Sequence, residues 1–132
     1  KEPPLGDVYR LDVNHNPVVN NTDGSVVGYK YFNLSVTNGV DNLCMSMTVV
    51  PEGIDGTIDI YMDSPHLSCG GKKVGSLSIR RTMPRKRQTL TAPIPGIRDM
   101  SGKHALFFVI KAGVKGKSVC EIHDFAMTVI PG

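Results

Sequence analysis

The chain has 132 residues, of which 40% are hydrophobic and 20% are charged, and its formal net charge at pH 7 is +3. No apolar stretch reaches the length of about 18 residues that a membrane-spanning helix needs, and so small a charge does not by itself indicate a nucleic-acid partner. We therefore expect one globular domain over residues 1–132, with residues 1–6 as a linker remnant. The chain opens on Lys1 without a signal-like segment, so we expect a piece of a longer protein.

Short alternating runs, separated by turn residues, follow one another along the chain. In residues 43–49, for example, every second residue is apolar, which predicts a half-buried strand. Residues 15–24 are rich in Asn, Pro, Asp and Gly, which indicates a loop. Residues 105–110 are apolar on both faces, which is typical of a central strand in a sandwich. Strands are expected at residues 8–13, 29–37, 43–49, 58–63, 74–79, 90–94, 105–110 and 119–129.

No segment shows a sustained helical period. Many short strands with frequent turn signals predict an all-β fold, namely a β-sandwich of jelly-roll type with two antiparallel sheets. The three cysteines include no Cys-x-x-Cys pair, so a zinc site is not indicated. We interpret Cys44 and Cys120, which fall in expected strands, as buried apolar residues, whereas Cys69 falls in a hairpin loop.

The stretch from Gly56 to Ile110 contains motifs in a specific order. A strand that ends in Asp-Ser-Pro at residues 63–65 is followed by a Gly-Lys-x-x-Gly hairpin, a Gln-Thr strand at 88–89 and a Gly-x-His start at 102–104. This order resembles family 6 carbohydrate-binding modules, which are often appended to family 43 glycoside hydrolases of the xylosidase and arabinofuranosidase type. The resemblance covers roughly residues 29–129 and implies a non-catalytic β-sandwich that binds a sugar.

The resemblance also implies a sugar site. In the family, an aromatic residue on each side stacks against the sugar ring, and an Asn from a late loop binds it. The family's Gly-Trp-Gln-Thr pattern reads Lys-Arg-Gln-Thr at residues 86–89, the chain has no Trp, and the late loop at 113–118 has no Asn. Transferred to this sequence, the stacking candidates are Tyr29 and Tyr31, and the polar or charged contacts are Arg87 and Gln88.

A structural calcium often accompanies the family fold, held by an N-terminal Glu and an Asp of the last strand. Here His123 aligns with that Asp, and Glu121 and Asp124 are the adjacent carboxylates, with Asp7 or Asp12 as further donors. Calcium takes about six to eight oxygen ligands, which a His does not supply. Glu121 and Asp124 are therefore the candidate ligands of a possible structural calcium, and the alternative is that these acids are solvated.

Residues 80–87 hold five basic residues within eight positions. Arginine pairs with a carboxylate through two hydrogen bonds, so this run could bind an anionic ligand such as a uronic acid. The alternative is a solvated loop that keeps the sheet edge soluble. A catalytic pair of carboxylates is not indicated, because turn chemistry accounts for Glu52 and Asp55, and no nucleophile-elbow or zinc-protease motif is present.

These observations lead us to expect a module that is not itself an enzyme and that belongs to a polysaccharide-degrading glycoside hydrolase. Its expected partners are an oligosaccharide or polysaccharide of the plant cell wall, such as xylan or arabinoxylan, and the catalytic domain of the same parent chain. No nucleic-acid or membrane partner is expected, and the expected location is secreted, periplasmic or on the cell surface of a bacterial source. The alternative is an accessory structural domain that has lost sugar binding and packs against the catalytic domain.

Overall fold

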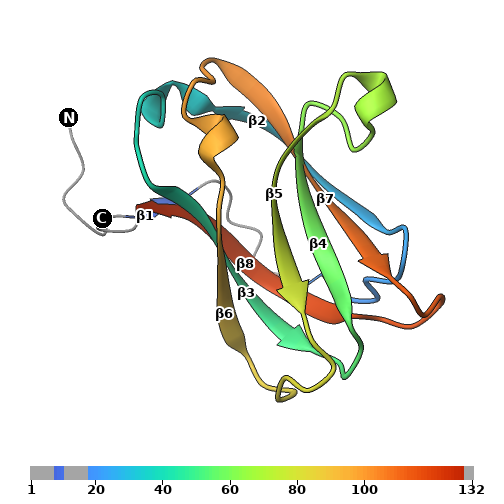
Figure 1. Ribbon diagram of the computed structural model, residues 1–132. Coiled ribbons are helices and arrows are strands. Elements are labelled where there is room, and N and C mark those ends of the chain that lie inside the picture. Colours follow the sequence, from blue (N-terminus) through green and yellow to red (C-terminus); the bar gives the residue numbers. More distant parts are fainter. Residues whose placement is uncertain (1–7, 11–17, 130–132) are drawn as a thin grey trace.

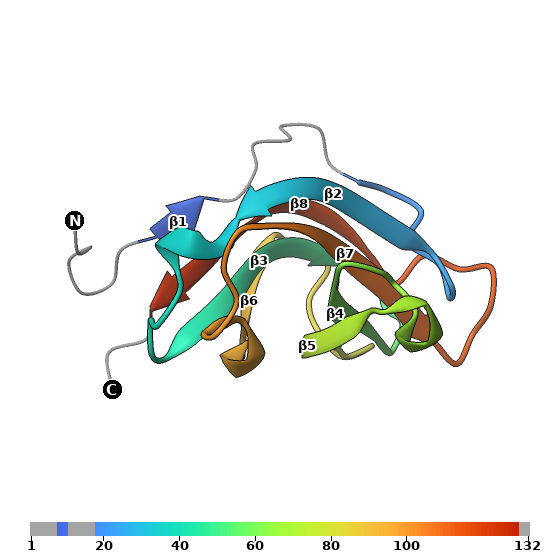
Figure 2. The same cartoon turned by 90° about the horizontal axis from the view of Figure 1, so that it is seen from above.

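The structure is a computed structural model that describes residues 8–10 and 18–129, except for the side chains of residues 8–10, 30, 31 and 36. The described strands form two four-stranded antiparallel sheets that face each other (Figures 1 and 2). The prediction of an all-β sandwich with two antiparallel sheets is thereby confirmed. The strands are β1 (Val8–Arg10), β2 (Val26–Asn33), β3 (Leu43–Pro51), β4 (Gly56–Met62), β5 (Lys72–Ile79), β6 (Gln88–Pro93), β7 (Lys103–Ala112) and β8 (Cys120–Val129).

The strand order is that of a jelly roll. The first sheet, sheet A, has the order β1-β8-β3-β6, and the second, sheet B, has the order β2-β7-β4-β5. The edge strands β5 and β6 lie next to each other, so the two sheets meet along that side. The strand β7 lies between β2 and β4, which agrees with its apolar character on both faces.

The core lies between the sheets and is built by every second residue of the strands. Met45, Met47 and Val49 of β3 are fully buried, and so are Ile58 and Ile60 of β4 on the facing sheet. Burying each large apolar side chain contributes about 1.5–3 kcal/mol, so this alternation fixes the face that each strand turns inward. The period of two that the sequence shows in residues 43–49 is confirmed.

The second strand differs from its prediction. Residues 29–37 were expected to be extended, but β2 ends at Asn33 and a single 3-10 turn, η1 (Leu34–Val36), follows. The Asn33 side chain accepts a hydrogen bond from the Ser35 backbone N–H at 2.9 Å. This local bond offers the backbone an alternative to the sheet ladder, which is why the alternating pattern did not continue as a strand.

The strand β8 carries one extra residue opposite β3. Thr48 pairs with Asp124 and Val49 pairs with Ile122, so His123 is left out of the register. In such a bulge the extra residue interrupts the alternation of the strand. Ile122 and Phe125 both remain buried in the core, at 2% and 4% exposure, on either side of the irregularity.

The two ends of the sandwich differ in their connections (Figure 1). One end carries the loops 52–55, 80–87 and 113–119, and we call it the arginine end. The other end carries the 3-10 turns η1, η2 (Leu67–Cys69) and η3 (Pro95–Ile97), and we call it the turn end. Among the described residues, no helix is long and apolar enough to cross a membrane.

The cysteines lie where the sequence predicted them. Cys44 and Cys120 are buried, and Cys69 is exposed in the β4–β5 connection at the turn end.

Candidate functional site

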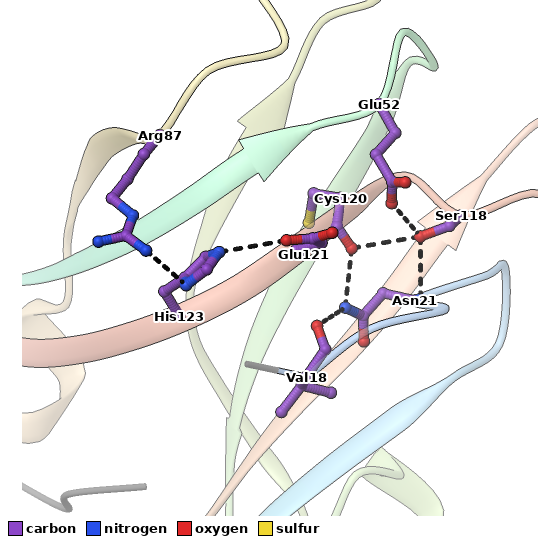
Figure 3. A network of polar contacts seen from close by, with 8 residues as sticks. All are labelled: Val18, Asn21, Glu52, Arg87, Ser118, Cys120, Glu121 and His123. Carbon is purple, nitrogen blue, oxygen red and sulfur yellow. Dashed lines mark hydrogen bonds and ion pairs between the residues drawn. The ribbon is translucent and has the colours of Figure 1, made fainter. Parts of the chain in front are cut away.

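The loops at the arginine end are joined by a buried polar network (Figure 3). Asn21 is 1% exposed, and its Nδ2 donates to the carbonyl oxygens of Val18 at 2.9 Å and Cys120 at 2.8 Å. The Ser118 hydroxyl donates to a carboxylate oxygen of Glu52 and accepts from the Asn21 backbone N–H at 3.2 Å. Because buried polar groups are costly to leave unpaired, this network holds the segment before β2, the β3–β4 loop and the start of β8 in one arrangement.

Beside this network, three side chains form a chain of hydrogen bonds. Arg87 Nη2 lies 3.2 Å from His123 Nδ1, and His123 Nε2 lies 3.2 Å from Glu121 Oε1 (Figure 3). A guanidinium can only donate and a carboxylate can only accept. Both bonds are therefore made when His123 is neutral and carries its proton on Nε2, so that Arg87 donates to Nδ1 and Nε2–H donates to Glu121. We call these three residues the arginine relay.

The bond to His123 orients the Arg87 side chain and leaves most of its N–H donors available. The residue is exposed, and only one of its guanidinium nitrogens bonds to His123. The remaining N–H groups can bind a sugar hydroxyl or, through two parallel bonds, a carboxylate.

Cys120 lies between the relay and the buried network but has no reactive character. Burial, together with the nearby carboxylates of Glu52 and Glu121, raises the pKa of its thiol to about 12. Because the thiolate is the reactive form of cysteine, this side chain is a structural residue at neutral pH.

Gln88 has a different role from Arg87, although the two are neighbours in sequence. The Gln88 Nε2 donates to the carbonyl oxygens of Pro84 at 3.0 Å and Lys86 at 3.3 Å. Its side chain thus folds back and closes the loop that precedes β6. These two bonds therefore fix the backbone of the loop from which the Arg87 side chain projects.

Tyr29 packs in an aromatic cluster between the sheets. Its ring centroid lies 5.8 Å from that of Phe108 and 4.8 Å from that of Phe125, in edge-on and tilted geometries. Phe32 contacts the same Phe125 ring at 6.4 Å. Such pairs contribute packing energy beyond area burial. The half-buried Tyr29 therefore stabilises the interior, and its part in sugar stacking stays a prediction.

The predicted sugar contacts are not gathered in one place. Tyr29 lies on β2, the edge strand of sheet B that is remote from β5, whereas Arg87 and Gln88 lie at the start of β6, which borders β5. Tyr31 belongs to β2, but its side chain lies outside the described residues. The structure brings Arg87 and Gln88 together and separates them from Tyr29.

The surface of the described residues has a hollow at each end of the sandwich. One, of about 700 Å³, is lined by residues of sheet B at the arginine end, including Thr57, Ser78, Arg80 and Lys111. The other, of about 680 Å³, lies at the turn end near Cys44 and Arg98. Both have the size of small-molecule sites.

Comparison with known proteins identifies the fold. No protein-family model and no curated protein sequence matches this chain. A solved family 43 arabinoxylan arabinofuranohydrolase from Bacillus subtilis superposes with a TM-score of 0.67 at 17% identity, over 96% of this chain and 24% of that one. A β-1,3-glucan-binding family 6 module from Bacillus halodurans gives 0.63 at 18% identity, over 96% and 86% of the two chains. Another family 6 carbohydrate-binding module gives 0.64 at 19% identity, over 98% and 85%.

The fold is that of a family 6 carbohydrate-binding module. This chain covers 86% and 85% of the two isolated modules but only 24% of the arabinofuranohydrolase. The likeness concerns architecture, because identity stays between 17% and 19% in these three comparisons.

The candidate ligands of the calcium that the resemblance implies lie on β8. Glu121 accepts a hydrogen bond from His123, and Asp124 lies beyond the bulge, exposed and paired with Thr48. Over residues 8–10 and 18–129, no group of three His, Cys, Asp or Glu side chains is arranged to hold a metal ion. The donors Asp7 and Asp12 lie outside the described residues, so the calcium site stays a prediction.

Two features of the site could not be read from the sequence. His123 joins the relay because a bulge changes its position in β8, and no residue pattern marked that bulge. Asn21 contacts Ser118 and Cys120, which lie 97 and 99 positions away along the chain. The loop composition of residues 15–24 predicted turns but gave no sign that one of its Asn residues is buried.

Proposed function

We propose that this protein is a non-catalytic carbohydrate-binding module of a polysaccharide-degrading glycoside hydrolase, and that it targets a plant cell-wall glycan such as xylan or arabinoxylan. The observation that carries the proposal is the superposition of almost the whole chain on isolated family 6 modules. The gain to the parent enzyme comes from tethering, because a bound module raises the effective concentration of glycan near the catalytic domain. Such a protein is secreted, periplasmic or displayed on the cell surface.

The contacts at the arginine end support binding over catalysis. Two carboxylates of the arginine end are engaged in hydrogen bonds, Glu52 with Ser118 and Glu121 with His123. Glycoside hydrolysis needs two carboxyl groups that face a substrate across a cleft. Arg87, held by His123, is the described side chain best placed to contact a sugar, with Gln88 shaping its loop and Tyr29 and Tyr31 as the predicted aromatic contacts.

The test is calorimetric titration of the protein with xylo-, arabino- and gluco-oligosaccharides, first with calcium and then with a chelator. We expect saturable heat with xylo-oligosaccharides, weakened by Arg87→Ala and unchanged by Arg98→Ala at the turn end. A loss of heat on chelation would support the calcium site. Flat traces across the panel would overturn the proposal for these glycans.

A second candidate function is docking onto the catalytic domain of the same parent chain without sugar binding. It is favoured by three exposed apolar side chains near the arginine end, Val19, Val26 and Val114, with exposed fractions of 50%, 44% and 48%. Exposed apolar surface is typical of interaction sites when it is contiguous. Flat sugar titrations together with co-elution of the separately expressed catalytic domain would favour this function.

A further inference from the structure

The loop that connects β5 to β6 displays an unusual concentration of positive charge. Within the part of the chain that the structure describes, none of its basic side chains forms an ion pair with a carboxylate, although four carboxylates are paired with Lys or Arg elsewhere. Two further exposed cations lie in the β7–β8 loop of the same end, namely Lys117 and Lys115, the latter paired with Asp23 at 3.6 Å. The exposed basic residues of the β5–β6 loop are Arg80, Arg81, Arg85, Lys86 and Arg87.

The shape of the loop does not depend on its cationic heads. The backbone N–H of Arg81 donates to Asp55 Oδ1 at 2.7 Å, and that of Met83 donates to the Arg80 carbonyl at 3.0 Å. The amide of Gln88 closes the other half through two carbonyl oxygens. The loop is thus formed by backbone and amide bonds, which leaves its guanidinium and ammonium groups for other partners.

Two of the guanidinium groups in the loop nevertheless lie against neighbouring residues that fix their orientation. The Arg85 guanidinium lies directly over Gly53, where an added Cβ would stand 2.6 Å from Nη2. Gly53 therefore provides the space that this side chain occupies. Arg87 is directed by His123 through the arginine relay (Figure 3). Oriented guanidinium groups lose less side-chain entropy on binding than mobile ones, which favours recognition of a planar anion.

The loop also borders a hollow of suitable size. Arg80 lines the hollow of about 700 Å³ together with Lys111 and the hydroxyl-bearing Thr57 and Ser78. Lys111 already pairs with the buried Asp59 at 3.4 Å. Arg80 is therefore the cation of this hollow that is available to a ligand, and the hydroxyls are neutral partners for sugar hydroxyl groups.

We infer that the β5–β6 loop recognises the carboxylate groups of uronic-acid residues, so that the glycan bound by this protein is acidic. The inference rests on the proposed function, since it names the chemical class of the glycan. Arginine binds a carboxylate through two parallel charge-assisted hydrogen bonds. Several arginines along one loop match the repeated carboxylates of a polymer, because each further contact becomes intramolecular after the first.

The loop favours an acidic sugar over a nucleic acid. Residues 80–87 contain no aromatic side chain on which a base could stack. The fold is that of sugar-binding modules, and Thr57 and Ser78 place hydroxyl groups, not further cations, beside Arg80. The hollow also contains the Asp23 carboxylate, which is already paired with Lys115 at 3.6 Å. Arg80 and the two hydroxyl groups therefore offer a cation and neutral polar groups to the carboxylate and the hydroxyls of a uronic-acid ring.

The experiment compares one polymer in two forms. Glucuronoxylan is titrated by calorimetry before and after its carboxyl groups have been reduced to hydroxymethyl groups, at low and at high salt. We expect the native polymer to bind about tenfold tighter than the reduced one at low salt, and the difference to shrink at high salt. Polygalacturonic acid, whose carboxylates lie on the backbone, shows whether side-chain or backbone uronates are preferred.

Matched variants assign the effect to the loop. Arg80→Gln with Arg87→Gln removes two charges from the β5–β6 loop, and Lys72→Gln with Lys103→Gln removes two exposed charges at the turn end. We expect the first pair to abolish the preference for the carboxylated polymer and the second pair to retain it, with unchanged melting temperatures in both. An equal loss in both pairs would overturn the assignment to the loop.

The outcomes separate this inference from the proposed function. Equal affinity for native and reduced glucuronoxylan would overturn the uronate inference while leaving sugar binding intact. The absence of binding heat with both polymers and with every oligosaccharide would overturn both the uronate inference and the proposed function. A sulfated polymer of similar charge that binds as tightly as glucuronoxylan would show a general polyanion surface and overturn the carboxylate assignment.

Discussion

The arginines at the two ends of the sandwich differ in whether a carboxylate is bonded to them. At the turn end, Arg98 lies 2.6 Å from an oxygen of Asp41 and 3.2 Å from one of Asp99. His104 lies 2.8 Å from Asp63 at the same end. At the arginine end, the cations of the β5–β6 loop form no ion pair among the described residues. Arg98 of the turn end is thus engaged by carboxylates of the fold, whereas the arginines of the β5–β6 loop have no carboxylate partner among the described residues.

The histidines of the two ends show the same contrast. Both ring nitrogens of His104 face acceptors, Nδ1 the Asp63 carboxylate and Nε2 the Ser101 carbonyl at 2.8 Å. The ring of His104 therefore bridges two groups of the fold, the Asp63 side chain and the Ser101 backbone. His123 faces a donor on one side and an acceptor on the other, so its ring links Arg87 to Glu121.

The largest expected difference between the ends concerns their cysteines. Burial raises the pKa of Cys120 to about 12, whereas free cysteine has a pKa of about 8.5, so its thiolate population at pH 8 is roughly a thousandfold smaller. We expect maleimide at pH 8 to label the exposed Cys69 of the turn end before Cys120. Mass spectrometry of peptides from the labelled protein measures the extent of labelling at each cysteine. Equal labelling of Cys120 and Cys69 would contradict the buried position between Glu52 and Glu121.

The same pKa predicts how stability changes in alkali. Because the folded-state pKa of Cys120 is raised, the unfolded chain ionises this thiol first. Its contribution to stability is complete below the pKa of the unfolded state and declines as pH rises from there toward about 12. Cys120→Ser should show less of this decline in urea unfolding between neutral and alkaline pH.

The next effect tests the network under the arginine end. Asn21→Ala removes the donor for two carbonyl oxygens, those of Val18 and Cys120. We expect the free energy of unfolding to fall by about 2–3 kcal/mol, measured by urea denaturation, because buried acceptors lose their partner. The control is Asn38→Ala at the turn end, where an exposed amide makes one bond of 3.2 Å to Met100. Similar losses in both variants would show that Asn21 is not the centre of the network.

A smaller loss of stability is expected from a variant at the turn end. His104→Gln keeps a polar side chain but cannot reach Asp63 and Ser101 from the two sides of a ring as His104 does. The side chains of His104 and Asp63 are 22% and 45% exposed, so solvent screening limits the loss of stability to about 1 kcal/mol. The exposed His66 serves as control through His66→Gln, which should leave the unfolding midpoint unchanged. No difference between the two variants would remove the structural role assigned to His104.

The smallest effect is expected in the β5–β6 loop. Arg81→Gln with Lys86→Gln should change the free energy of unfolding by no more than about 0.5 kcal/mol, because exposed unpaired charges add little to stability. Thermal melting at low salt measures this, and relief of like-charge repulsion would favour a small increase. A loss comparable to that of His104→Gln would mean that these cations serve the fold after all.

The sequence predicted the framework of the molecule well, because burial has a period that composition reveals. Residues 43–49 alternate in the sequence and form β3 with its inner face buried. The end of β2 at Asn33 was missed, because a single side-chain bond to Ser35 competes with strand pairing there. Local chemistry of this kind leaves no periodic trace.

The candidate site was predicted only in part. Arg87 and Gln88 are adjacent in sequence, so their proximity could be read from it, and their contacts with a sugar stay predictions. Tyr29 was expected at a sugar surface, but the inward face of β2 turns its ring toward Phe108 and Phe125. His123 depends on a bulge, and Asn21 depends on a contact across nearly the whole chain, so neither had a local signal.

The bulge in β8 has a consequence for how such a site can be gained or lost. Glu121 and Ile122 pair with Val50 and Val49, and Asp124 resumes the register opposite Thr48. Deleting His123 alone would join two stretches that already alternate correctly, so the core on both sides would keep its facing residues. A single-codon deletion or insertion at this point can therefore remove or create the arginine relay while the jelly-roll fold is kept. Related domains can thus change their ligand at this strand through intermediates that still fold.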